Sequence, residues 1–309
     1  MYDLIGDIHG HADELLQLLE VLSYQKKQGV YEHPERKVIF LGDFIDRGPQ
    51  IRQVLEIVRR MVDQGSALAV MGNHEFNALA FHTEHLHRTE AFLRKRDLKN
   101  IRQHGQTILQ LTDKVLGESI EWFRTLPMWL DRDGLRVVHA CWDDKAIATI
   151  QAARPHGEAL TADFLHAACE PGNALFDAVE IVLKGKEAAL PLGQSFEDKD
   201  GHVRTATRVR WFVPPHGQTY RTYALTDKIN CDLKLEQSTI DDAVPYPLDA
   251  KPVFVGHYWL SGSQPELLAD NVACVDYSVA KKGFLCAYRW SGEQKLNNDN
   301  FLWAGNERA

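Results

Sequence analysis

The sequence is poor in cysteine and contains no long apolar run, and both absences narrow the class of protein. Its 309 residues include 5 cysteines, which are widely separated and form no Cys-x-x-Cys pair. Neither a disulfide framework nor a zinc ribbon is supported, and a reducing cytoplasm fits best. No apolar run approaches the roughly 20 residues that span a bilayer, and the first residues form a strand pattern rather than a secretory signal. We therefore expect a soluble cytoplasmic protein.

The sequence also lacks an excess of positive charge. Lysine and arginine number 35 against 43 aspartate and glutamate residues, which gives a formal net charge of -8. Such a chain repels phosphodiester backbones, so nucleic acid could bind only through a local basic patch. Hydrophobic residues make up 44% of the chain, enough for the core of one large α/β domain or two small ones. A compact enzyme is the default class.

The first part of the chain alternates between strand and helix patterns. Short apolar runs at residues 1–6, 37–42 and 67–72 predict strands. The segment after the first run spaces its leucines at i, i+3, i+4 and i+7, as a helix does, and Pro49 suits the first turn of a second helix. This alternation predicts an α/β fold, with helices packed around a sheet.

A polar and basic segment, residues 83–106, comes later than the third strand pattern. Its histidines and arginines are compatible with a metal site or a nucleic-acid surface. Glu84, Glu90 and Asp97 interleave with the basic residues, however, so we interpret the segment as helical with a solvated face.

Prolines and glycines punctuate a later stretch, residues 151–250. Strand patterns precede it at 135–140 and return after residue 250. We therefore predict a single domain over residues 1–309, in which about 151–250 form a cap-like insertion that elaborates the core.

Polar side chains follow five apolar strand patterns, at the point where each strand ends. In chain order they are Asp7 and His9; Asp43, Asp46 and Arg47; Asn73, His74 and Glu75; His139; and His257. Because ligands of α/β sheets bind at the carboxyl ends of the strands, we expect these side chains to meet. Carboxylate, imidazole and amide donors without thiolate suit divalent Mn, Fe or Zn.

Taken singly, each cluster has an ordinary explanation. An Asp-x-His pair is a common turn, Asn73 is a good helix N-cap, and Asp46 with Arg47 could be a surface ion pair. The joint occurrence of all five after apolar strands predicts one site. Glycines directly precede four of the clusters, where a residue without Cβ lets loops crowd around an ion.

The motifs GDIHG, GDFIDRG, GNHE, VH and GH occur in this order between Gly6 and His257. The sequence in this respect resembles the calcineurin-like metallophosphoesterases, and among them the phosphoprotein phosphatase type. The resemblance covers the catalytic core and implies a fold of central β-sheets, arranged as a sandwich, flanked by helices.

The resemblance also implies a ligand set for two divalent metal ions, with manganese favoured and iron or zinc as alternatives. Asp7, His9 and Asp43 would bind one ion, and Asp43, Asn73, His139 and His257 would bind the other. A shared carboxylate such as Asp43 would offset the repulsion between two neighbouring cations. A hydroxide bridging the two ions would attack phosphorus in line.

The remaining motif residues would act on the substrate. His74 would protonate the leaving oxygen as general acid, Asp46 would orient its ring, and Arg47 would hold phosphate oxygens. For Glu75 we prefer a simpler interpretation, a carboxylate that complements the helix dipole.

Two positions depart from the pattern of the wider superfamily. In the sequence GHYW, Trp259 stands where many relatives have a second metal-binding histidine. The phosphoprotein phosphatase branch lacks this histidine too. That branch usually has VHGG where this chain has VHAC, so Trp142 could line the substrate pocket.

A second phosphate clamp could lie in the insertion. In an extended run, Arg204, Arg208 and Arg210 would share one face, and Arg210 is favoured because Trp211 and Phe212 follow it. The alternative is a charged edge strand. Tyr258, Trp259 and Tyr277 could stack a nucleobase or fill the core, and the sequence leaves both possibilities open.

The leading hypothesis is a two-metal phosphatase that acts on phosphoproteins or small phosphate esters. A dinucleoside polyphosphate hydrolase is the first alternative, although symmetric bacterial hydrolases of that kind commonly have a non-acidic residue in place of Asp46 and an aspartate in place of Glu75. A nucleic-acid end phosphatase is the second, and a binding module without activity is the third. The last is disfavoured because none of the expected site positions is vacant.

Overall fold

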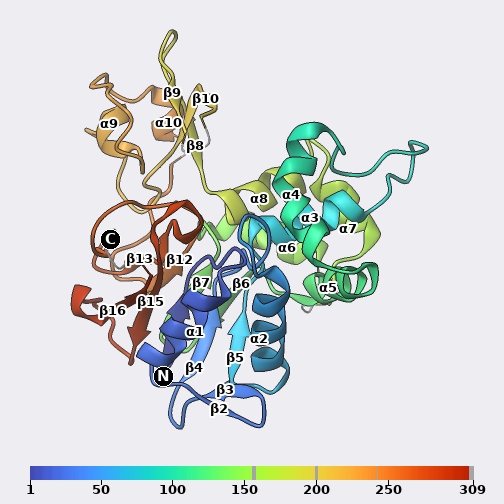
Figure 1. Cartoon of the computed structure of the whole chain (residues 1–309). Coiled ribbons are helices and arrows are strands. Elements are labelled where there is room, and N and C mark those ends of the chain that lie inside the picture. Colours follow the sequence, from blue (N-terminus) through green and yellow to red (C-terminus); the bar gives the residue numbers. More distant parts are fainter. Residues whose placement is uncertain (155–157, 199–200, 242, 306–309) are drawn as a thin grey trace.

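The computed structural model describes residues 1–154, 158–198, 201–241 and 243–305, and its centre is a pair of β-sheets (Figure 1). The first sheet contains β1 (Tyr2–Ile5), β4 (Lys37–Phe40), β5 (Ala67–Ala69), β14 (Asp276–Tyr277), β15 (Phe284–Trp290) and β16 (Phe301–Ala304). In this sheet β4 runs parallel to β1 and β5, while β15 pairs antiparallel with β1, β14 and β16. The second sheet has the order β13 (Val272–Cys274), β12 (Val253–Val255), β7 (Leu135–Val138) and β6 (Trp129–Arg132).

The two sheets pack face to face because apolar side chains alternate along their strands. Leu4 and Ile39 of the first sheet share one buried cluster with Val137 and Phe254 of the second. A fully buried side chain of this kind contributes about 1.5–3 kcal/mol by leaving water. The predicted sandwich is confirmed, and this apolar layer holds its two sheets together.

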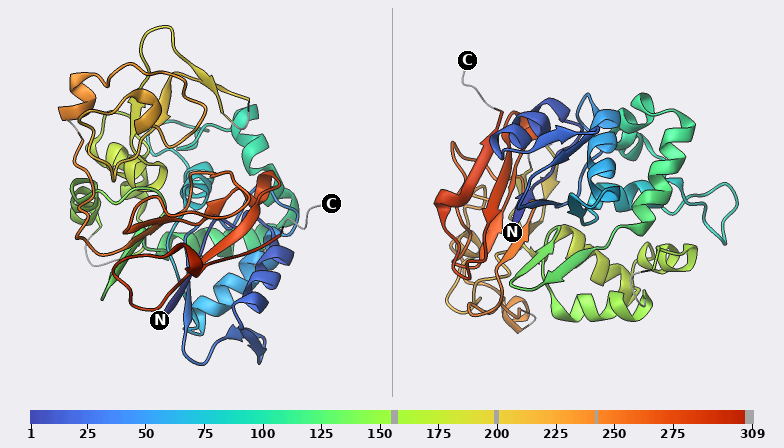
Figure 2. Two further views of the ribbon diagram at one scale, coloured as in Figure 1. Left: turned by 90° about the vertical axis from the view of Figure 1, so that its left-hand side faces the viewer. Right: turned by 90° about the horizontal axis from the view of Figure 1, so that it is seen from below.

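Helices cover the outer faces of the sandwich (Figures 1 and 2). They are α1 (Ala12–Val21), α2 (Ile51–Asp63), α3 (Asn73–His82), α4 (Leu98–Gln110), α5 (Asp113–Thr125), α6 (Asp144–Ala153), α7 (Ala162–Ala168) and α8 (Ala174–Lys184). The predicted leucine stripe of α1 is buried against the first sheet, and Ile5 and Phe40 belong to the same core cluster. Among the described residues, no helix combines the length and apolar character needed to cross a membrane.

The helix predicted over residues 83–106 is wrong in its first half. Residues 83–97 form an irregular connection, and α4 begins only at Leu98, where the Asp97 carboxylate accepts a hydrogen bond from the Asn100 amide. Asp97 therefore acts as an N-cap, so the charge pattern that suggested one continuous helix contains a helix start.

The stretch of residues 151–250 consists of two different parts. Helices α7 and α8 pack into the main core, whereas a second part has a small core of its own, built around Ala188, Val209, Tyr220 and Tyr223. Its elements are β8 (Glu187–Ala189), β9 (Phe196–Glu197), β10 (Val203–Arg204), β11 (Ala206–Arg208), α9 (Tyr220–Tyr223) and α10 (Gln237–Asp241).

This second part stands off the sandwich at the end away from the N-terminus, in yellow to orange in Figures 1 and 2. A hairpin of β2 (Gln25–Lys27) and β3 (Val30–Glu32) lies at the opposite end. That residues 151–250 act together as a cap remains a prediction. All five cysteines are free.

Candidate metal centre

The loops that follow β1, β4, β5, β7 and β12 meet at one end of the sandwich, and backbone hydrogen bonds join them. The amides of Ile8 and His9 both donate to the Asp43 carbonyl, at 3.1 and 2.8 Å. The Gly256 amide donates to the His139 carbonyl at 2.8 Å. The five polar clusters thus come together from positions far apart in the sequence.

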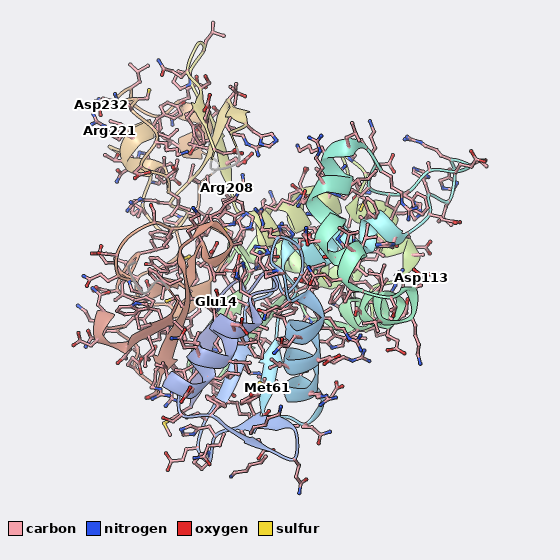
Figure 3. All side chains as sticks on the ribbon, viewed as in Figure 1. Glu14, Met61, Asp113, Arg208, Arg221 and Asp232 are labelled. Carbon is pink, nitrogen blue, oxygen red and sulfur yellow. The ribbon has the colours of Figure 1, made fainter. Side chains whose placement is uncertain are left out.

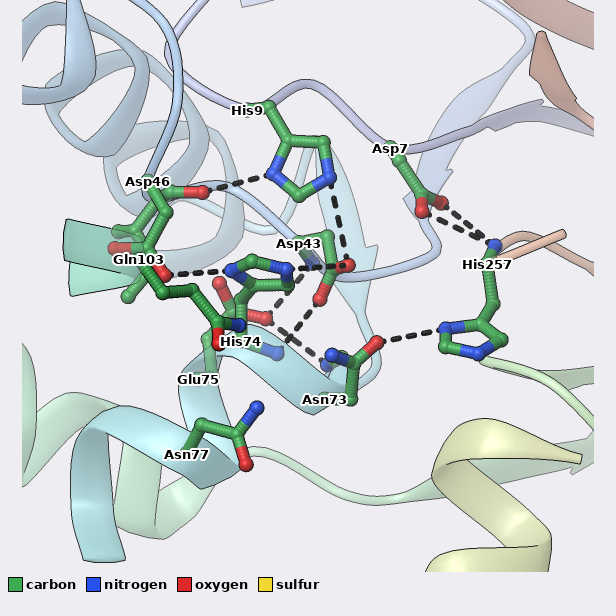
Figure 4. Close-up of polar contacts among 12 residues, drawn as sticks. Asp7, His9, Asp43, Asp46, Asn73, His74, Glu75, Asn77, Gln103 and His257 are labelled. Atoms are coloured by element: carbon green, nitrogen blue, oxygen red, sulfur yellow. Dashed lines mark hydrogen bonds and ion pairs between the residues drawn. The ribbon is translucent and has the colours of Figure 1, made fainter. Parts of the chain in front are cut away.

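Asp43 lies at the centre of this arrangement (Figure 4). Its Oδ2 atom is 3.6 Å from Nε2 of His9 and 3.5 Å from Nε2 of His139. Two groups of possible ligand atoms, each within 4.8 Å of one another, both contain Asp43: one with His9 and His74, the other with His139 and His257. One carboxylate is therefore shared by two adjoining groups of possible ligand atoms.

His9 supplies an argument that the residues fit a cation. Its Nδ1 atom donates to the Ile45 carbonyl at 2.9 Å, which leaves Nε2 as the nitrogen that faces Asp43. That Nε2 atom is buried and has no hydrogen-bond partner among the described residues. Since buried polar atoms are nearly always satisfied, a metal ion is a natural partner for it.

Asn73 completes the other half of the centre. Its Oδ1 atom is 2.7 Å from Nδ1 of His257 and 3.0 Å from Nε2 of His139. The opposite nitrogen of His139 hydrogen-bonds to the Leu41 carbonyl at 2.7 Å, which fixes the ring orientation. An amide oxygen and two imidazole nitrogens therefore converge beside Asp43.

Asp7 contacts the loop after β12. Its carboxylate accepts the His257 backbone amide, at 3.2 and 3.1 Å, and it belongs to neither of the two ligand groups. Burial and the nearby Asp276 carboxylate raise the pKa of Asp7 well above its ordinary value. A cation bound nearby would offset that accumulation of negative charge. Its role as a ligand stays a prediction.

Glycine is required at two points of closest approach. A Cβ atom on Gly72 would lie 2.2 Å from Oδ1 of Asp43, and one on Gly256 would lie 2.1 Å from Oδ1 of Asp7. Only a residue without a side chain fits at either position, because the neighbouring carboxylates could not keep their places.

The backbone of the site is strained. The φ angles of His9, Asp43, Asp46, Arg47 and His257 are +46°, +53°, +67°, +69° and +70°. Left-handed backbone costs of the order of 1–3 kcal/mol at each such residue and persists only where surrounding contacts hold it. The concentration of strain in these loops indicates a functional site.

Glu75 has a larger role than the helix-dipole interpretation allowed. It is fully buried, and its carboxylate accepts hydrogen bonds from the amides of Asp43 and Phe44, both at 2.8 Å, and of Gly72, at 3.0 Å. Burial and the neighbouring Asp43 raise the pKa of Glu75 to about 7. Glu75 therefore ties the loop after β4 to the start of α3.

His74, a member of the first group of possible ligand atoms, also forms a close pair with Asp46 (Figure 4). Nδ1 of His74 lies 2.5 Å from Oδ2 of Asp46, while Nε2 of His74 lies 4.0 Å from Oδ2 of Asp43. The carboxylate thus holds one ring nitrogen and leaves the other directed toward the ligand groups.

Two further side chains that contact Asp46 come from α4. Nδ1 of His104 is 2.8 Å from Oδ1 of Asp46, and the Thr107 hydroxyl donates to the same oxygen at 2.5 Å. Both were missed in the sequence, because His104 was assigned to a solvated face and Thr107 lies just beyond that segment. Their i, i+3 spacing, which places them on one side of a helix, was the available signal.

Arg47 packs against an aromatic ring at the edge of the centre. Its guanidinium carbon is 3.9 Å from the centre of the Trp259 ring, and the Trp259 amide donates to Oδ2 of Asp276 at 2.7 Å. Trp259, which stands in place of a histidine ligand, therefore supports the arginine. Trp142 is only 6% exposed, and its indole nitrogen donates to Asp144 at 2.9 Å.

The three candidate arginines of the insertion differ in their surroundings, and Arg204 pairs with Asp198. Arg210 donates from Nε to the Ala224 carbonyl at 3.2 Å. Arg208 pairs with Glu187 and lies at the base of the insertion (Figure 3). The pKa of His257 lies well below its ordinary value, chiefly because the ring is buried and also because His139 and Arg208 are near it. Arg208 therefore acts electrostatically on the centre.

Comparison with known proteins agrees with this geometry. The family model of calcineurin-like phosphoesterases matches residues 2–171. The chain is 45% identical over 74 residues to the asymmetrical bis(5'-nucleosyl)-tetraphosphatase PrpE of Halalkalibacterium halodurans, which covers 24% of this chain and 30% of that protein. The Bacillus subtilis protein of the same name is 43% identical over 74 residues, again 24% and 30%. The chain therefore spans less than a third of the length of these curated relatives.

A solved structure shares the overall fold. The serine/threonine phosphatase from Saccharomyces cerevisiae with similarity to human phosphatase PP5 aligns with 100% of this chain and 80% of its own, with a TM-score of 0.50 and 13% sequence identity. At this identity the likeness is one of fold alone.

Proposed function

The chain belongs to the calcineurin-like phosphoesterase family, whose members are phosphoester hydrolases, and on this premise we propose that it is a two-metal phosphatase acting on phosphate monoesters. The observation that carries the proposal is the position of Asp43, which is shared by two groups of possible ligand atoms, one of which includes His74 of the His74 and Asp46 pair. The fold alone would not select this reaction, whereas the joint placement of ligands and acid supports it.

The donors fit two divalent cations. Asp7, His9 and Asp43 would hold one ion, and Asp43, Asn73, His139 and His257 the other. When bound, the two ions supply Lewis-acid polarisation of the phosphate and lower the pKa of water in the site. The mixture of carboxylate, imidazole and amide donors favours manganese and also accommodates iron or zinc.

His74 is the proposed catalytic acid. As the bond between phosphorus and the leaving oxygen breaks, Nε2 of His74 gives its proton to that oxygen, because Nδ1 is held by Asp46. Asp46 is a positioning residue in this step, since it keeps the ring in the orientation that directs Nε2 toward the ligand groups.

Arginines would hold the phosphate. The Arg47 guanidinium, supported by Trp259, offers several donors in a fixed plane. Arg210 is the second candidate from the sequence, and the electrostatic proximity of Arg208 to His257 makes Arg208 a third. The proposed substrate is a phosphoprotein or a small phosphate ester, and the proposed location is the cytoplasm, where the five free cysteines would stay reduced.

Asymmetrical cleavage of a dinucleoside tetraphosphate is the second candidate function. It is favoured by the names of the relatives that share 45% and 43% identity with part of this chain. The same metal ligands would serve, because the reaction also breaks a bond between phosphorus and oxygen. The leaving group differs, since a phosphate oxygen of an anhydride needs less protonation than an alcohol.

A substrate panel tests the proposal. Protein loaded with manganese would be assayed against phosphopeptides, phosphoserine, p-nitrophenyl phosphate, diadenosine tetraphosphate and oligonucleotides with terminal phosphates. We expect the highest kcat/KM on the monoesters. A clear preference for diadenosine tetraphosphate would transfer the assignment to the second candidate, and absence of hydrolysis of every compound would overturn both.

A further inference from the structure

The Asp46 carboxylate is held on both of its oxygens. Oδ2 pairs with His74 at 2.5 Å, and Oδ1 lies 2.8 Å from Nδ1 of His104 and 2.5 Å from the hydroxyl of Thr107. Thr107 in turn accepts the Asp46 backbone amide at 3.0 Å. Asp46, His104 and Thr107 are 2%, 5% and 0% exposed, so solvent does not replace these contacts.

The donor and the acceptor of each of these hydrogen bonds can be assigned. Burial alone would raise the pKa of Asp46, but hydrogen bonds from His104 and His74 hold it well below its ordinary value. Asp46 is therefore a carboxylate that only accepts hydrogen bonds, and each histidine presents Nδ1 with its proton. A fixed Asp46 in turn determines where Nε2 of His74 points.

A third histidine, His82, contacts His104. Nε2 of His82 lies 3.1 Å from Nε2 of His104. Since His104 carries its proton on Nδ1, its Nε2 accepts and His82 donates. Burial and the neighbouring His104 lower the pKa of His82 to about 4, so His82 stays neutral near pH 7 and can donate in this way. His82 thus selects the tautomer of His104 that Asp46 requires.

The orientation of α4 is unusual for a surface helix. His104 and Thr107 point inward, while Leu98 is 73% exposed and Leu109 is 80% exposed. Surface helices ordinarily bury their apolar side. This helix instead buries polar groups against the site, which indicates that their position matters more than the burial of its leucines.

A second contact keeps α4 next to α3. Arg94 donates from Nη1 to Oδ1 of Asn77 and from Nη2 to Oε1 of Gln103, at 2.9 and 3.0 Å. Asn77 lies one turn after His74 on α3, and Gln103 precedes His104 on α4. Figure 4 shows Asn77 and Gln103 on the same side of the His74 ring.

We propose that His104 and Thr107 are positioning residues of the reaction, which hold Asp46 so that His74 directs its proton at the leaving group, and that His82 supports His104 in this role. The proposal rests on the proposed phosphatase function. The orientation of the proposed acid would then depend on a chain of hydrogen-bonded side chains, which runs from α4 through the loop after β4 to α3.

The test compares two substitutions at His104. His104→Leu keeps a similar volume and removes the donor, whereas His104→Asn retains an amide that can donate to Asp46 in place of Nδ1. For His104→Leu we expect kcat on phosphoserine to fall about 10- to 100-fold, the range typical of lost outer-shell contacts, with KM and bound manganese unchanged. p-Nitrophenyl phosphate, whose leaving group needs little protonation, should lose much less.

His104→Asn should restore most of the lost activity, and Thr107→Ser should retain more than Thr107→Val. Arg102→Ala, on the exposed side of the same helix, is the matched control and should behave as the wild type. Thermal unfolding of every variant establishes that it folds. An equal loss on both esters, or no rescue by His104→Asn, would assign His104 to stability alone and overturn the proposal.

A measurement on metal-free protein separates this inference from the function on which it rests. The 2.5 Å contact between His74 and Asp46 should give a low-field imidazole proton resonance in the NMR spectrum. We expect this resonance to shift or disappear in His104→Leu and to persist in His104→Asn. An unchanged resonance in His104→Leu would overturn the positioning role. A changed resonance in a protein that hydrolyses no ester would instead overturn the phosphatase function.

Discussion

The site has two halves that are built in different ways. The metal half consists of the proposed metal ligands, and the acid half consists of His74 and Asp46. Each proposed metal ligand lies on a loop that directly follows a strand or, in the case of Asn73, at the first residue of α3, so the sandwich itself fixes the ligands. Asp46 lies on such a loop and His74 in the first turn of α3, but the orientation of this pair depends on His104 and Thr107, which belong to a surface helix. Ligand position is therefore a property of the core, whereas acid orientation is a property of how one helix docks.

The largest effect is expected where the two halves meet, at Asp43. Asp43→Asn removes the charge shared by both ligand groups, so manganese content and turnover should disappear together. Metal analysis alongside kcat on p-nitrophenyl phosphate provides the check. Asp63→Asn, at the exposed end of α2, should change neither quantity. Full activity of Asp43→Asn would refute the metal assignment.

His74→Asn should remove the proposed acid without removing the metal. Bound manganese should be retained, because Asn73 and the other ligands stay in place, while kcat on phosphoserine falls by about 100- to 10,000-fold, as expected for loss of a general acid. The loss on p-nitrophenyl phosphate should be much smaller. His87→Asn, on an exposed loop, serves as the control. Equal losses on the two esters would exclude His74 as the acid.

Arg47→Ala should affect substrate binding more than either half of the chemistry. A charge-assisted hydrogen bond contributes about 1.5–3 kcal/mol, which predicts a rise in KM of about 10- to 100-fold with a smaller fall in kcat. Steady-state kinetics on phosphoserine would measure both, with Arg52→Ala on the exposed side of α2 as the control. An unchanged KM would mean that phosphate is held elsewhere.

The smallest effect concerns the arginines of the insertion. Because Arg208 already pairs with Glu187, Arg208→Ala should raise KM only about threefold to tenfold, as loss of one modest contact would. Arg210→Ala should raise KM less, since Arg210 donates to the Ala224 carbonyl. Parallel measurement of the two variants decides between them, and a larger effect at Arg210 would restore the preference derived from the sequence.

Much of the fold and of the metal half could be predicted from the sequence because both depend on local patterns. Alternation of apolar residues identifies a strand, and a short motif after it identifies a loop, so the convergence of five loops follows from the geometry of a sheet. The irregular residues 83–97 were missed because one N-cap, Asp97, looks like any other acidic residue in a charged segment.

The acid half could not be predicted to the same extent. Asp46 and His104 are separated by 58 positions, and their contact depends on the rotation of α4 about its own axis. Charge pattern favoured the opposite rotation, with the polar side outward. Glu75 illustrates the same limit, because its first-turn position was evident while its contacts with Asp43 and Phe44 depend on how two loops meet.

The separate small core around Tyr220 and Tyr223 has a practical consequence for altering this enzyme. Because these side chains form an apolar interior separate from the main core, substitutions confined to that small core should disturb the interior of the sandwich little. Trp211, Phe212 and Tyr246 belong to the main core cluster, so they have to be kept. Libraries aimed at new specificities can therefore diversify residues around the small core while conserving these three aromatic residues and the strand-end loops.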